Sequence, residues 1–425
     1  MTSPRWKQLA LLLAAALAVR LVAAGVWQSR LDGPFFFGDS ENYWTLGRAI
    51  AQGQPYRCGP EQAEVFRTPG YPLLLSPIFV IAGSDASVIW GRVQNALLGT
   101  LAVAGVWCLA EQLFNQRAAT VAAIIAAFYP GAVAVSVAVL SETPFCGLML
   151  LQLVLWTFAW RAASPRKAAA LAVAAGLVAG VATLVRPSWL LFTPIAVIVA
   201  AVVDTCRKRH LWVGGAMLAG LIVTMVPWWI RNARVTGRFV PTTLQVGASL
   251  YDGLNPLATG ASDMSVVPKT LDAHHARLPG VENGSEFQLD RHCRTRALQW
   301  ARSNPARVTQ LAGIKVLRMW NIWPNEQSLS SWPVRLAMAF TYVPVMILAI
   351  LGVARTIRCG WPYTLCWLPA IYFTALHAVF VSSIRYRQPA MLPLIVLAAG
   401  AITTRGREAK TRGTARPQPK EESSR

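Results

Sequence analysis

The chain has 425 residues, of which 54% are hydrophobic and only 14% are charged. Soluble globular domains carry roughly 25% charged residues, so this composition excludes an ordinary soluble protein and predicts a polytopic membrane protein. The net charge of +21 would suit a nucleic-acid partner, but the cations fall in short clusters between apolar runs. Because no basic-aromatic module is visible, the charge favours membrane topology over nucleic-acid binding.

Ten apolar runs have about the length needed to cross a bilayer. Backbone groups inside lipid must pair internally, and runs this continuous are helices rather than barrel strands. The expected spans are 8–27, 88–112, 118–137, 142–160, 168–185, 188–204, 211–230, 332–353, 362–381 and 388–403. The first run resembles a signal peptide, but its length and the spans after it favour an uncleaved span. Segment 71–82 is short and contains proline, so we expect a re-entrant or interfacial helix.

Basic residues occupy every second short loop and thereby predict the orientation of the spans. They are Arg5, Lys7, Arg117, Arg161, Arg166, Lys167, Arg207, Lys208, Arg209, Arg355 and Arg358. The positive-inside rule places these loops, both termini and the basic tail 404–425, which we expect to be disordered, in the cytoplasm. Residues 1–403 then form one transmembrane domain. Its two long extracytoplasmic segments, 28–87 and 231–331, would carry interfacial helices, including an amphipathic one at 308–323.

Acidic and basic side chains recur on the opposite face, where the positive-inside rule expects few cations. They are Asp39, Glu41, Arg67, Glu142, Arg186, Arg231, Arg385 and Arg387. Any one of them could be a snorkelling or helix-capping residue, but together they suit transfer of a phosphate-linked group. Arginines bind phosphate through paired hydrogen bonds, and a carboxylate beside them can act as general base on an acceptor hydroxyl.

The sequence contains no Walker loop, GxSxG elbow or HExxH helix, so we expect an activated lipid-linked donor rather than an ATP-driven reaction. No cofactor is indicated, although Asp39 and Glu142 could bind a divalent metal. The seven cysteines lack zinc or redox spacing. Two of them, Cys58 and Cys293, fall in the predicted outer segments and could form a disulfide or remain free thiols.

Six sequence blocks, in this order, resemble the GT-C glycosyltransferases. The resemblance is to the family 39 type, which includes protein O-mannosyltransferases and lipid A aminoarabinose transferases. The blocks are GDSENYW after the first span, FRTPGYPLLL, FYPGAVAVSVAVLSETPF, LVRPSWLLFTP, PWWIRNARVTGRFVPTTLQVGASLYDGLNP and IRYRQPAMLPLIVLAAG. No single block is specific, but their order and topology together are.

The resemblance implies an inner-membrane enzyme that transfers a sugar, with inversion, from a polyprenyl-phosphate donor to an extracytoplasmic glycan, lipid or protein. It implies Asp39 as the catalytic base. The residues expected to contact the donor phosphate are Arg67, Arg385 and Arg387. The residues expected to support the site are Glu41, Tyr43, Tyr71, Glu142, Arg186, Arg231 and Asn232. Better-known relatives often have adjacent acids after the first span; here Ser40 separates Asp39 from Glu41, which weakens the assignment of Glu41.

Two other functions stay open. A lipid or sugar transporter or flippase is commonly built from repeated halves with charges near the bilayer midplane, whereas this sequence has no visible repeat and only Arg20 lies inside a span. An O-antigen ligase or polymerase-type enzyme would carry its large outer loop late in the chain, without an Asp-bearing loop after the first span.

Overall fold

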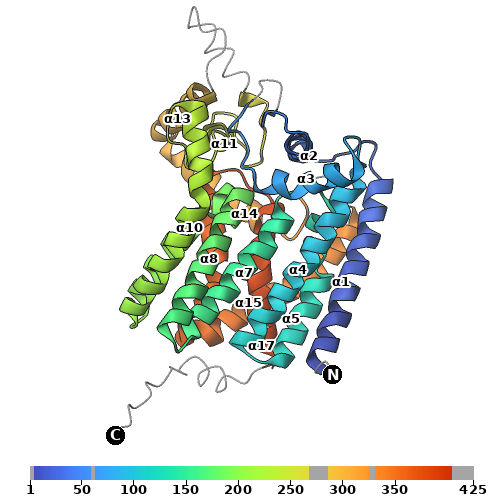
Figure 1. Cartoon of the computed structure of the whole chain (residues 1–425), viewed down its shortest axis with the longest axis vertical. Coiled ribbons are helices and arrows are strands. Elements are labelled where there is room, and N and C mark those ends of the chain that lie inside the picture. The colour runs from blue at the N-terminus through green and yellow to red at the C-terminus, as the bar shows by residue number, and fades with distance from the viewer. Residues whose placement is uncertain (1–3, 59–62, 268–285, 326–330, 404–425) are drawn as a thin grey trace, which may run out of the picture.

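The computed structural model describes residues 4–58, 63–267, 286–325 and 331–403. Within these ranges the chain forms helices and no β-strand, apart from one antiparallel bridge between Cys58 and Ala63. Figure 1 shows a bundle of long helices with shorter helices gathered at one end. The described residues therefore confirm the all-helical architecture that the apolar runs predict.

Two groups of helices make up this arrangement. The bundle contains α1 (Pro4–Ser29), α4 (Ile89–Leu113), α5 (Gln116–Phe128), α6 (Pro130–Val137), α7 (Glu142–Arg161), α8 (Pro165–Val185), α9 (Phe192–Val203), α10 (Arg207–Thr236), α15 (Trp332–Thr356), α16 (Thr364–Val379) and α17 (Gln388–Thr403). The shorter group contains α2 (Gly38–Ala51), α3 (Gly70–Ala82), α11 (Val246–Gly253), α13 (Glu286–Ser303) and α14 (Pro305–Trp320). The 3-10 helices η1 (Pro187–Trp189), η3 (Ile357–Cys359) and η4 (Ile384–Arg387) connect bundle helices.

Six described helices are long and apolar enough to cross a membrane, and the bent pair α5 and α6 would make a seventh. The six are α1, α4, α7, α8, α10 and α15. This confirms a polytopic membrane protein. The expected count of ten spans stays a prediction, because α9 has 12 residues and α16 and α17 have 16 each, fewer than the ~20 of a typical span.

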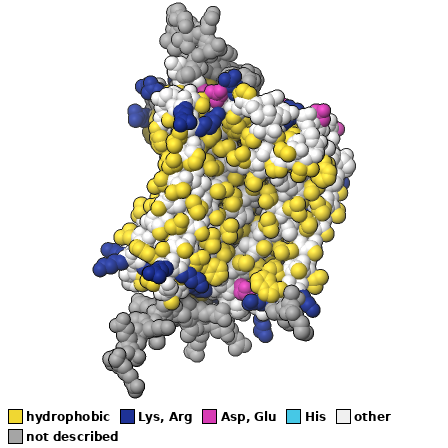
Figure 2. Space-filling model, viewed as in Figure 1, with side chains coloured by type: hydrophobic (Ala, Val, Ile, Leu, Met, Phe, Trp, Pro, Cys, Tyr) yellow, Lys and Arg dark blue, Asp and Glu magenta, His cyan; other side chains and the backbone are white. Residues whose placement is uncertain are grey.

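The surface of the bundle agrees with a membrane setting. Figure 2 shows hydrophobic side chains spread over the flank of the bundle, with Lys and Arg side chains towards its two ends. Large apolar side chains such as Leu101, Ile198 and Ile350 are 61–62% exposed. In water such a surface would favour aggregation; against lipid chains it is the expected exterior.

The predicted span 118–137 is broken near its middle. The axes of α5 and α6 meet at 53°, and Pro130, the first residue of α6, supplies the reason because it has no N–H to continue the helix. The carbonyls freed at the end of α5 accept hydrogen bonds from Arg20, at 3.2 Å for Ala126 and 3.0 Å for Ala127. Arg20, buried inside the first span, therefore satisfies backbone groups rather than reaching water.

Glycines allow α8 and α10 to approach closely. A Cβ atom on Gly176 would lie 1.9 Å from the carbonyl oxygen of Met217, and one on Gly220 would lie 2.4 Å from that of Val173. Close approach through small residues is a common means of holding helices together in lipid, where burial of apolar side chains contributes little free energy of association.

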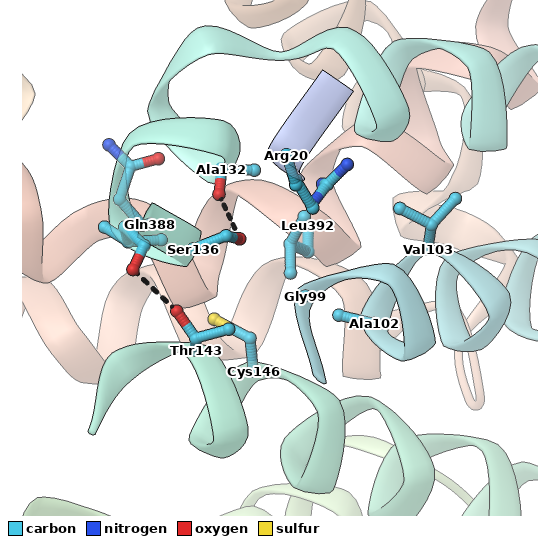
Figure 3. Close-up of a pocket in the computed structure, with 11 residues that line it drawn as sticks. Arg20, Gly99, Ala102, Val103, Ala132, Ser136, Thr143, Cys146, Gln388 and Leu392 are labelled. Carbon is cyan, nitrogen blue, oxygen red and sulfur yellow. Dashed lines mark hydrogen bonds between the residues drawn. The ribbon is translucent and has the colours of Figure 1, made fainter. Parts of the chain in front are cut away.

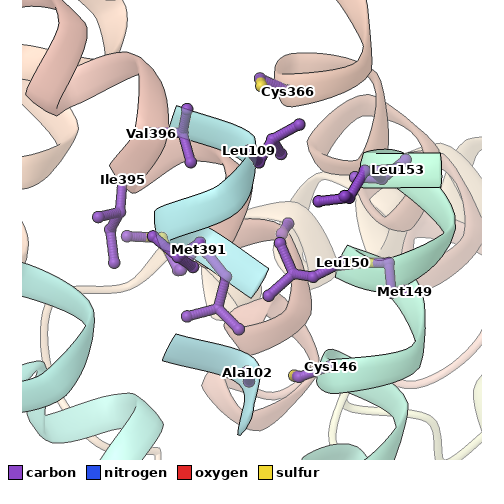
Figure 4. Close-up of a cluster of buried hydrophobic side chains, with 14 of the residues drawn as sticks. Ala102, Leu109, Cys146, Met149, Leu150, Leu153, Cys366, Met391, Ile395 and Val396 are labelled. Atoms are coloured by element: carbon purple, nitrogen blue, oxygen red, sulfur yellow. The ribbon is translucent and has the colours of Figure 1, made fainter. Parts of the chain in front are cut away.

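Elsewhere the bundle is filled by large side chains. Figure 4 shows Leu109 of α4, Leu150 of α7 and Met391 of α17 meeting in the core.

Cations from the predicted cytoplasmic loops gather at one end of the bundle. Arg161 donates to the carbonyl of Gln112, Arg209 to that of Ala162 at 2.8 Å, and Arg355 to that of Ala401. Each cation thus caps the C-terminal end of a helix, which the helix dipole favours. This is the end at which α1 begins and α17 ends, and α2, α3, α11 and α13 lie at the other (Figure 1). The structure groups the loops as expected, while the cytoplasmic assignment of this end stays a prediction.

Candidate active site

The helix α2 carries the predicted catalytic acid. It lies on α3 through the buried side chains of Tyr43, Trp44 and Leu46, so part of the outer segment 28–87 is a surface helix. Asp39 and Glu41 lie in its first turn, where the helix dipole favours acids. Glu41 is exposed, whereas Asp39 is 34% exposed and faces two arginines.

Both carboxylate oxygens of Asp39 are paired. Arg67 donates to Oδ1 at 2.6 Å, and Arg385 donates to Oδ2 at 3.0 Å. Arg67 precedes α3 and also donates to Oε1 of Gln245 at 3.0 Å. Its guanidinium lies over the ring of Tyr43, 5.2 Å from the centroid. The acid is therefore held by side chains from two distant segments of the chain.

Glu142 continues this network behind Arg385. It is the first residue of α7 and its side chain is only 1% exposed. Its Oε1 forms ion pairs with Nε of Arg385 at 2.8 Å and with Nη1 of Arg186 at 3.1 Å. Arg186 ends α8, where Pro187 stops the helix. We call the following five residues the charged cluster: Asp39, Arg67, Glu142, Arg186 and Arg385.

The cluster stays ionised at neutral pH. Burial alone would raise the pKa of Asp39, but the charges of Arg67 and Arg385 and their hydrogen bonds outweigh burial and hold that pKa well below its usual range. In return the neighbouring acids raise the pKa of Arg385 above its ordinary value despite burial. Three guanidinium groups and two carboxylates leave one positive charge, which suits an anionic ligand.

Aromatic rings surround the charged cluster. The ring of Tyr386 lies 5.0 Å from the guanidinium carbon of Arg385 and 5.4 Å from that of Arg186. Its ring stacks on His377 at 4.5 Å. Tyr43 donates to Oγ of Ser141 at 3.4 Å and meets the ring of Tyr71 edge-on at 5.1 Å, so Tyr71 packs behind the site.

Sequence reasoning missed Tyr386 and Gln245. Tyr386 stands between two predicted site arginines in IRYRQP, so its position could have been noticed. Gln245 follows Leu244, whose N–H donates to the carbonyl of Val65 at 3.0 Å. That link between two outer segments brings Gln245 beside Arg67, and no local pattern signals it.

Arg387 does not join the charged cluster. It is fully buried, and its Nη1 donates to the carbonyls of Met319, at 3.2 Å, and of Asn321. Its guanidinium carbon lies 3.9 Å from the ring centroid of Tyr342. The structure therefore places this predicted phosphate contact against α14 and α15, away from Asp39. The physical reason is the 3-10 turn of η4, which points side chains two residues apart in different directions.

Two further predicted residues lie at the end of α10. Arg231 lies over the rings of Tyr56 and Trp228, with centroid distances of 5.2 and 4.9 Å. Asn232 donates to the carbonyls of Val240 and Thr242 at 3.1 and 3.4 Å. Asn232 thus holds the chain that follows α10, whereas Arg231 packs on rings of the first outer segment and of α10 itself. Neither residue contacts Asp39 through a described hydrogen bond or ion pair.

The described residues form neither a metal site nor a disulfide between Cys58 and Cys293. No three His, Cys, Asp or Glu side chains in them come together as metal ligands, and the divalent metal considered from the sequence stays a prediction. Cys58 and Cys293 are separate buried thiols in the structure.

A small, mainly apolar cavity lies among α1, α4, α6, α7 and α17 (Figure 3). Arg20, Gly99, Ser136, Thr143 and Gln388 are among its lining residues. Ser136 and Thr143 donate to the carbonyls of Ala132 and Val135 at 2.7 and 2.8 Å. Its volume of about 10 Å³ has room for about one water molecule and none for a sugar. This cavity is therefore too small to be a sugar-binding site.

The chain resembles known membrane transferases. A family model described as dolichyl-phosphate-mannose-protein mannosyltransferase matches residues 67–230, a range that contains Arg67, Glu142 and Arg186. No match was found among curated proteins.

Among solved structures, the archaeal oligosaccharyltransferase AglB from Archaeoglobus fulgidus, in complex with an inhibitory peptide and a dolichol-phosphate, is similar in fold. The TM-score is 0.59, the identity is 15%, and the alignment covers 94% of this chain and 50% of AglB. The apo form of the same enzyme gives a TM-score of 0.58 at 14% identity, covering 93% of this chain and 50% of that one. This chain thus spans about half the length of AglB.

A second protein shows a weaker likeness. ArnT from Cupriavidus metallidurans, in the apo state, is 16% identical, and the alignment covers 96% of this chain and 78% of ArnT. Its TM-score of 0.46 is too low to support an argument from structure.

Proposed function

We propose that the chain is a membrane glycosyltransferase of the GT-C superfamily and that it transfers a sugar from a polyprenyl-phosphate donor to an acceptor outside the cytoplasm. The family-model match over residues 67–230 and the similarity in fold to AglB support this proposal. The observation that carries the proposal is the charged cluster. Asp39 and Arg67 of the first outer segment meet Arg385 from near the end of the chain, and Glu142 and Arg186 extend the set.

Asp39 is the general base of the proposed reaction. Its carboxylate takes the proton of an acceptor hydroxyl or amine while the acceptor atom forms a bond to the anomeric carbon. In the same step the bond from that carbon to the donor phosphate oxygen breaks, and its electron pair leaves with the phosphate. One displacement of this kind inverts the anomeric configuration.

Arginines stabilise the departing phosphate. Charge develops on the lipid phosphate as the sugar leaves, and preorganised cations aimed at developing charge lower the barrier. Arg67 and Arg385 fill this role because they already flank Asp39. We leave Arg387 out, since its guanidinium donates to backbone carbonyls of Met319 and Asn321.

The setting of the reaction follows from the distribution of charge. The charged cluster lies at the end of the bundle opposite Arg161, Arg209 and Arg355, so the positive-inside rule favours an extracytoplasmic site in the inner membrane, with both termini in the cytoplasm. The prenyl chain of the donor would lie in the bilayer beside the bundle. The acceptor is an envelope glycan, a lipid or a protein.

Transfer by the purified full-length chain tests the proposal. We would incubate it with radiolabelled polyprenyl-phosphate sugars and envelope fractions, and compare wild type with Asp39→Asn. Loss of the base should lower the transfer rate by about 10²-fold or more. Mass spectrometry of envelope glycans from a deletion strain would identify the missing sugar.

Asp85→Asn is the matched control, because Asp85 is an exposed acid of the same outer segment and its substitution should leave transfer unchanged. Full activity of Asp39→Asn would remove Asp39 from the mechanism. Transfer from a soluble sugar nucleotide, with none from the lipid-linked sugars, would contradict the proposed donor.

A further inference from the structure

Asp39 is a weak base while its present contacts persist, because two arginines hold its pKa well below the usual range. Each of its oxygens accepts a hydrogen bond from an arginine, at 2.6 Å from Arg67 and 3.0 Å from Arg385. A general base must have an oxygen within hydrogen-bond reach of the proton that it removes. Each oxygen keeps a second lone pair for an acceptor proton, but Asp39 becomes an effective base only when at least one arginine contact is given up.

The two arginines are each held by a second partner. Arg385 uses one nitrogen for Asp39 and another for Glu142, at 2.8 Å. Arg67 likewise uses one nitrogen for Asp39 and another for Gln245, at 3.0 Å. Both guanidinium groups would therefore stay in place if their hydrogen bonds to Asp39 were broken.

The difference in burial indicates that an incoming anion would displace the carboxylate of Asp39 rather than that of Glu142. The side chain of Glu142 is 1% exposed and that of Asp39 is 34% exposed, while Arg67 and Arg385 are 11% and 17% exposed. An incoming anion can thus approach the arginines on the side of Asp39 and not on the side of Glu142. Phosphate oxygens form strong paired hydrogen bonds with guanidinium groups, as carboxylates do. The single positive charge of the charged cluster matches the single negative charge of a phosphodiester.

We propose that the donor phosphate and Asp39 compete for the guanidinium groups of Arg67 and Arg385, so that donor binding frees Asp39 for the acceptor. The inference rests on the proposed function and adds an order to it: donor first, acceptor second. Glu142 is then a positioning residue, which keeps Arg385 in place during the exchange. Such an order prevents the site from ionising an acceptor when no sugar is present.

The release also makes Asp39 a stronger base. The charged and titratable groups around it are Arg67, Arg385, Tyr43, Glu142 and Arg186. A phosphate anion among them offsets the field of the arginines, so the pKa of Asp39 rises towards its ordinary value.

Binding of a short-chain polyprenyl phosphate to the detergent-solubilised full-length protein tests this exchange. Calorimetry would compare wild type with Asp39→Asn and Glu142→Gln. Because Asp39→Asn removes the competitor, it should bind the phosphate about tenfold tighter, a size expected when a charge-assisted hydrogen bond no longer has to be broken. Glu142→Gln should bind it more weakly, since Arg385 loses its support. Asp85→Asn should match wild type.

Equal or weaker binding by Asp39→Asn would overturn the exchange and leave the proposed function standing. Equal tightening in both variants would also overturn it, because it would reflect net charge alone. Failure of wild type to bind the phosphate would contradict the proposed donor itself.

A measurement on wild type avoids reliance on the folding of a variant. Infrared difference spectra of protein with ¹³C-labelled aspartate carboxyl groups should show a carboxylate band change at saturating polyprenyl phosphate. An unchanged aspartate spectrum at saturation would overturn the exchange.

Discussion

Lys315 of α14 has no exposed surface, and its amine lies between the ends of the outer helix α11 and the bundle helix α16. Its Nζ donates to the carbonyl of Gly253, at the end of α11, and to that of Val379, at the end of α16, at 2.9 and 2.7 Å. Val379 lies five residues before Ile384, where η4 begins. One buried side chain of α14 thus joins the outer segment to the turn that positions Arg385.

The titration of Lys315 should be visible in stability. Burial lowers the pKa of Lys315 to about 8, from an ordinary 10.5, although nearby Asp252 opposes the shift. The unfolded chain therefore binds this proton between pH 8 and pH 10.5 while the folded chain has lost it. The free energy of unfolding should rise with pH across that window, by about 3 kcal/mol in total.

Melting curves of wild type and Lys315→Met, in detergent between pH 7 and pH 10, would measure this rise. The variant removes the amine, so the melting temperature of wild type relative to the variant should increase above pH 8. A constant difference across the window would contradict the assignment. Other titrating groups are common to both proteins and cancel in the comparison.

The sequence predicts only in part which residues come together in the charged cluster. Asp39, Glu142 and Arg186 lie at ends of apolar runs, so alternation of the spans indicates that they share a face. The pairing of Asp39 with Arg385, which is 346 residues away, depends on which helices are neighbours, and no local pattern encodes that. The position of Arg387 was not predictable for a different reason: on a helix with three residues per turn, the side chains of residues two apart point about 120° apart.

Among the elements, α8 and α10 depend on each other most directly. The site for a Cβ on Gly220 is occupied by the carbonyl of Val173, 2.4 Å away. A backbone carbonyl cannot rotate aside as a side chain can, so any larger residue must push the two helices apart. Arg186, at the end of α8, would move with that shift, and with it an ion pair of Glu142.

Gly220→Leu should therefore destabilise the folded protein by about 1–3 kcal/mol, the usual range for overpacking. Gly215→Leu is the matched control: it lies in the same helix, and a Cβ there meets nothing within 4 Å. Melting temperature and yield of monodisperse protein in detergent would compare the two. Equal stability of both variants would show that the helices can separate without cost.

Element types were easier to predict than their shapes. The long apolar runs became helices because lipid leaves the backbone no other partner. Pro130 could have signalled the bend between α5 and α6, since proline removes a helix hydrogen bond. The helix α2 was hidden by its many polar residues, although Tyr43, Leu46 and Gly47 recur at the spacing that buries one helix face.

The whole molecule is polarised by charge, with helix-capping arginines at one end and the charged cluster at the other. If the positive-inside rule holds here, the loop before α4 faces outward and the loop before α8 faces the cytoplasm. Ser84 and Ser164 are exposed in these two loops, and replacing serine with cysteine changes little in size.

Labelling of intact cells with a membrane-impermeant maleimide would test this topology. Ser84→Cys should react from outside, and Ser164→Cys only after the membrane is permeabilised, each measured relative to the native cysteines. The reverse result would place the charged cluster in the cytoplasm and contradict an extracytoplasmic acceptor.

The contact between Arg20 and the end of α5 has a consequence for biosynthesis. Arg20 enters the bilayer with the first span, but Ala126 and Ala127, whose carbonyls it binds, follow it by 106 and 107 residues. At about 5–20 residues per second, the ribosome needs about 5–20 s to supply them. Until then α1 carries an arginine whose insertion costs about 2.5–3.5 kcal/mol, and its apolar residues alone must hold it in the membrane. The buried guanidinium of Arg20 thus gains its partners from outside α1 only after α5 has been synthesised and inserted.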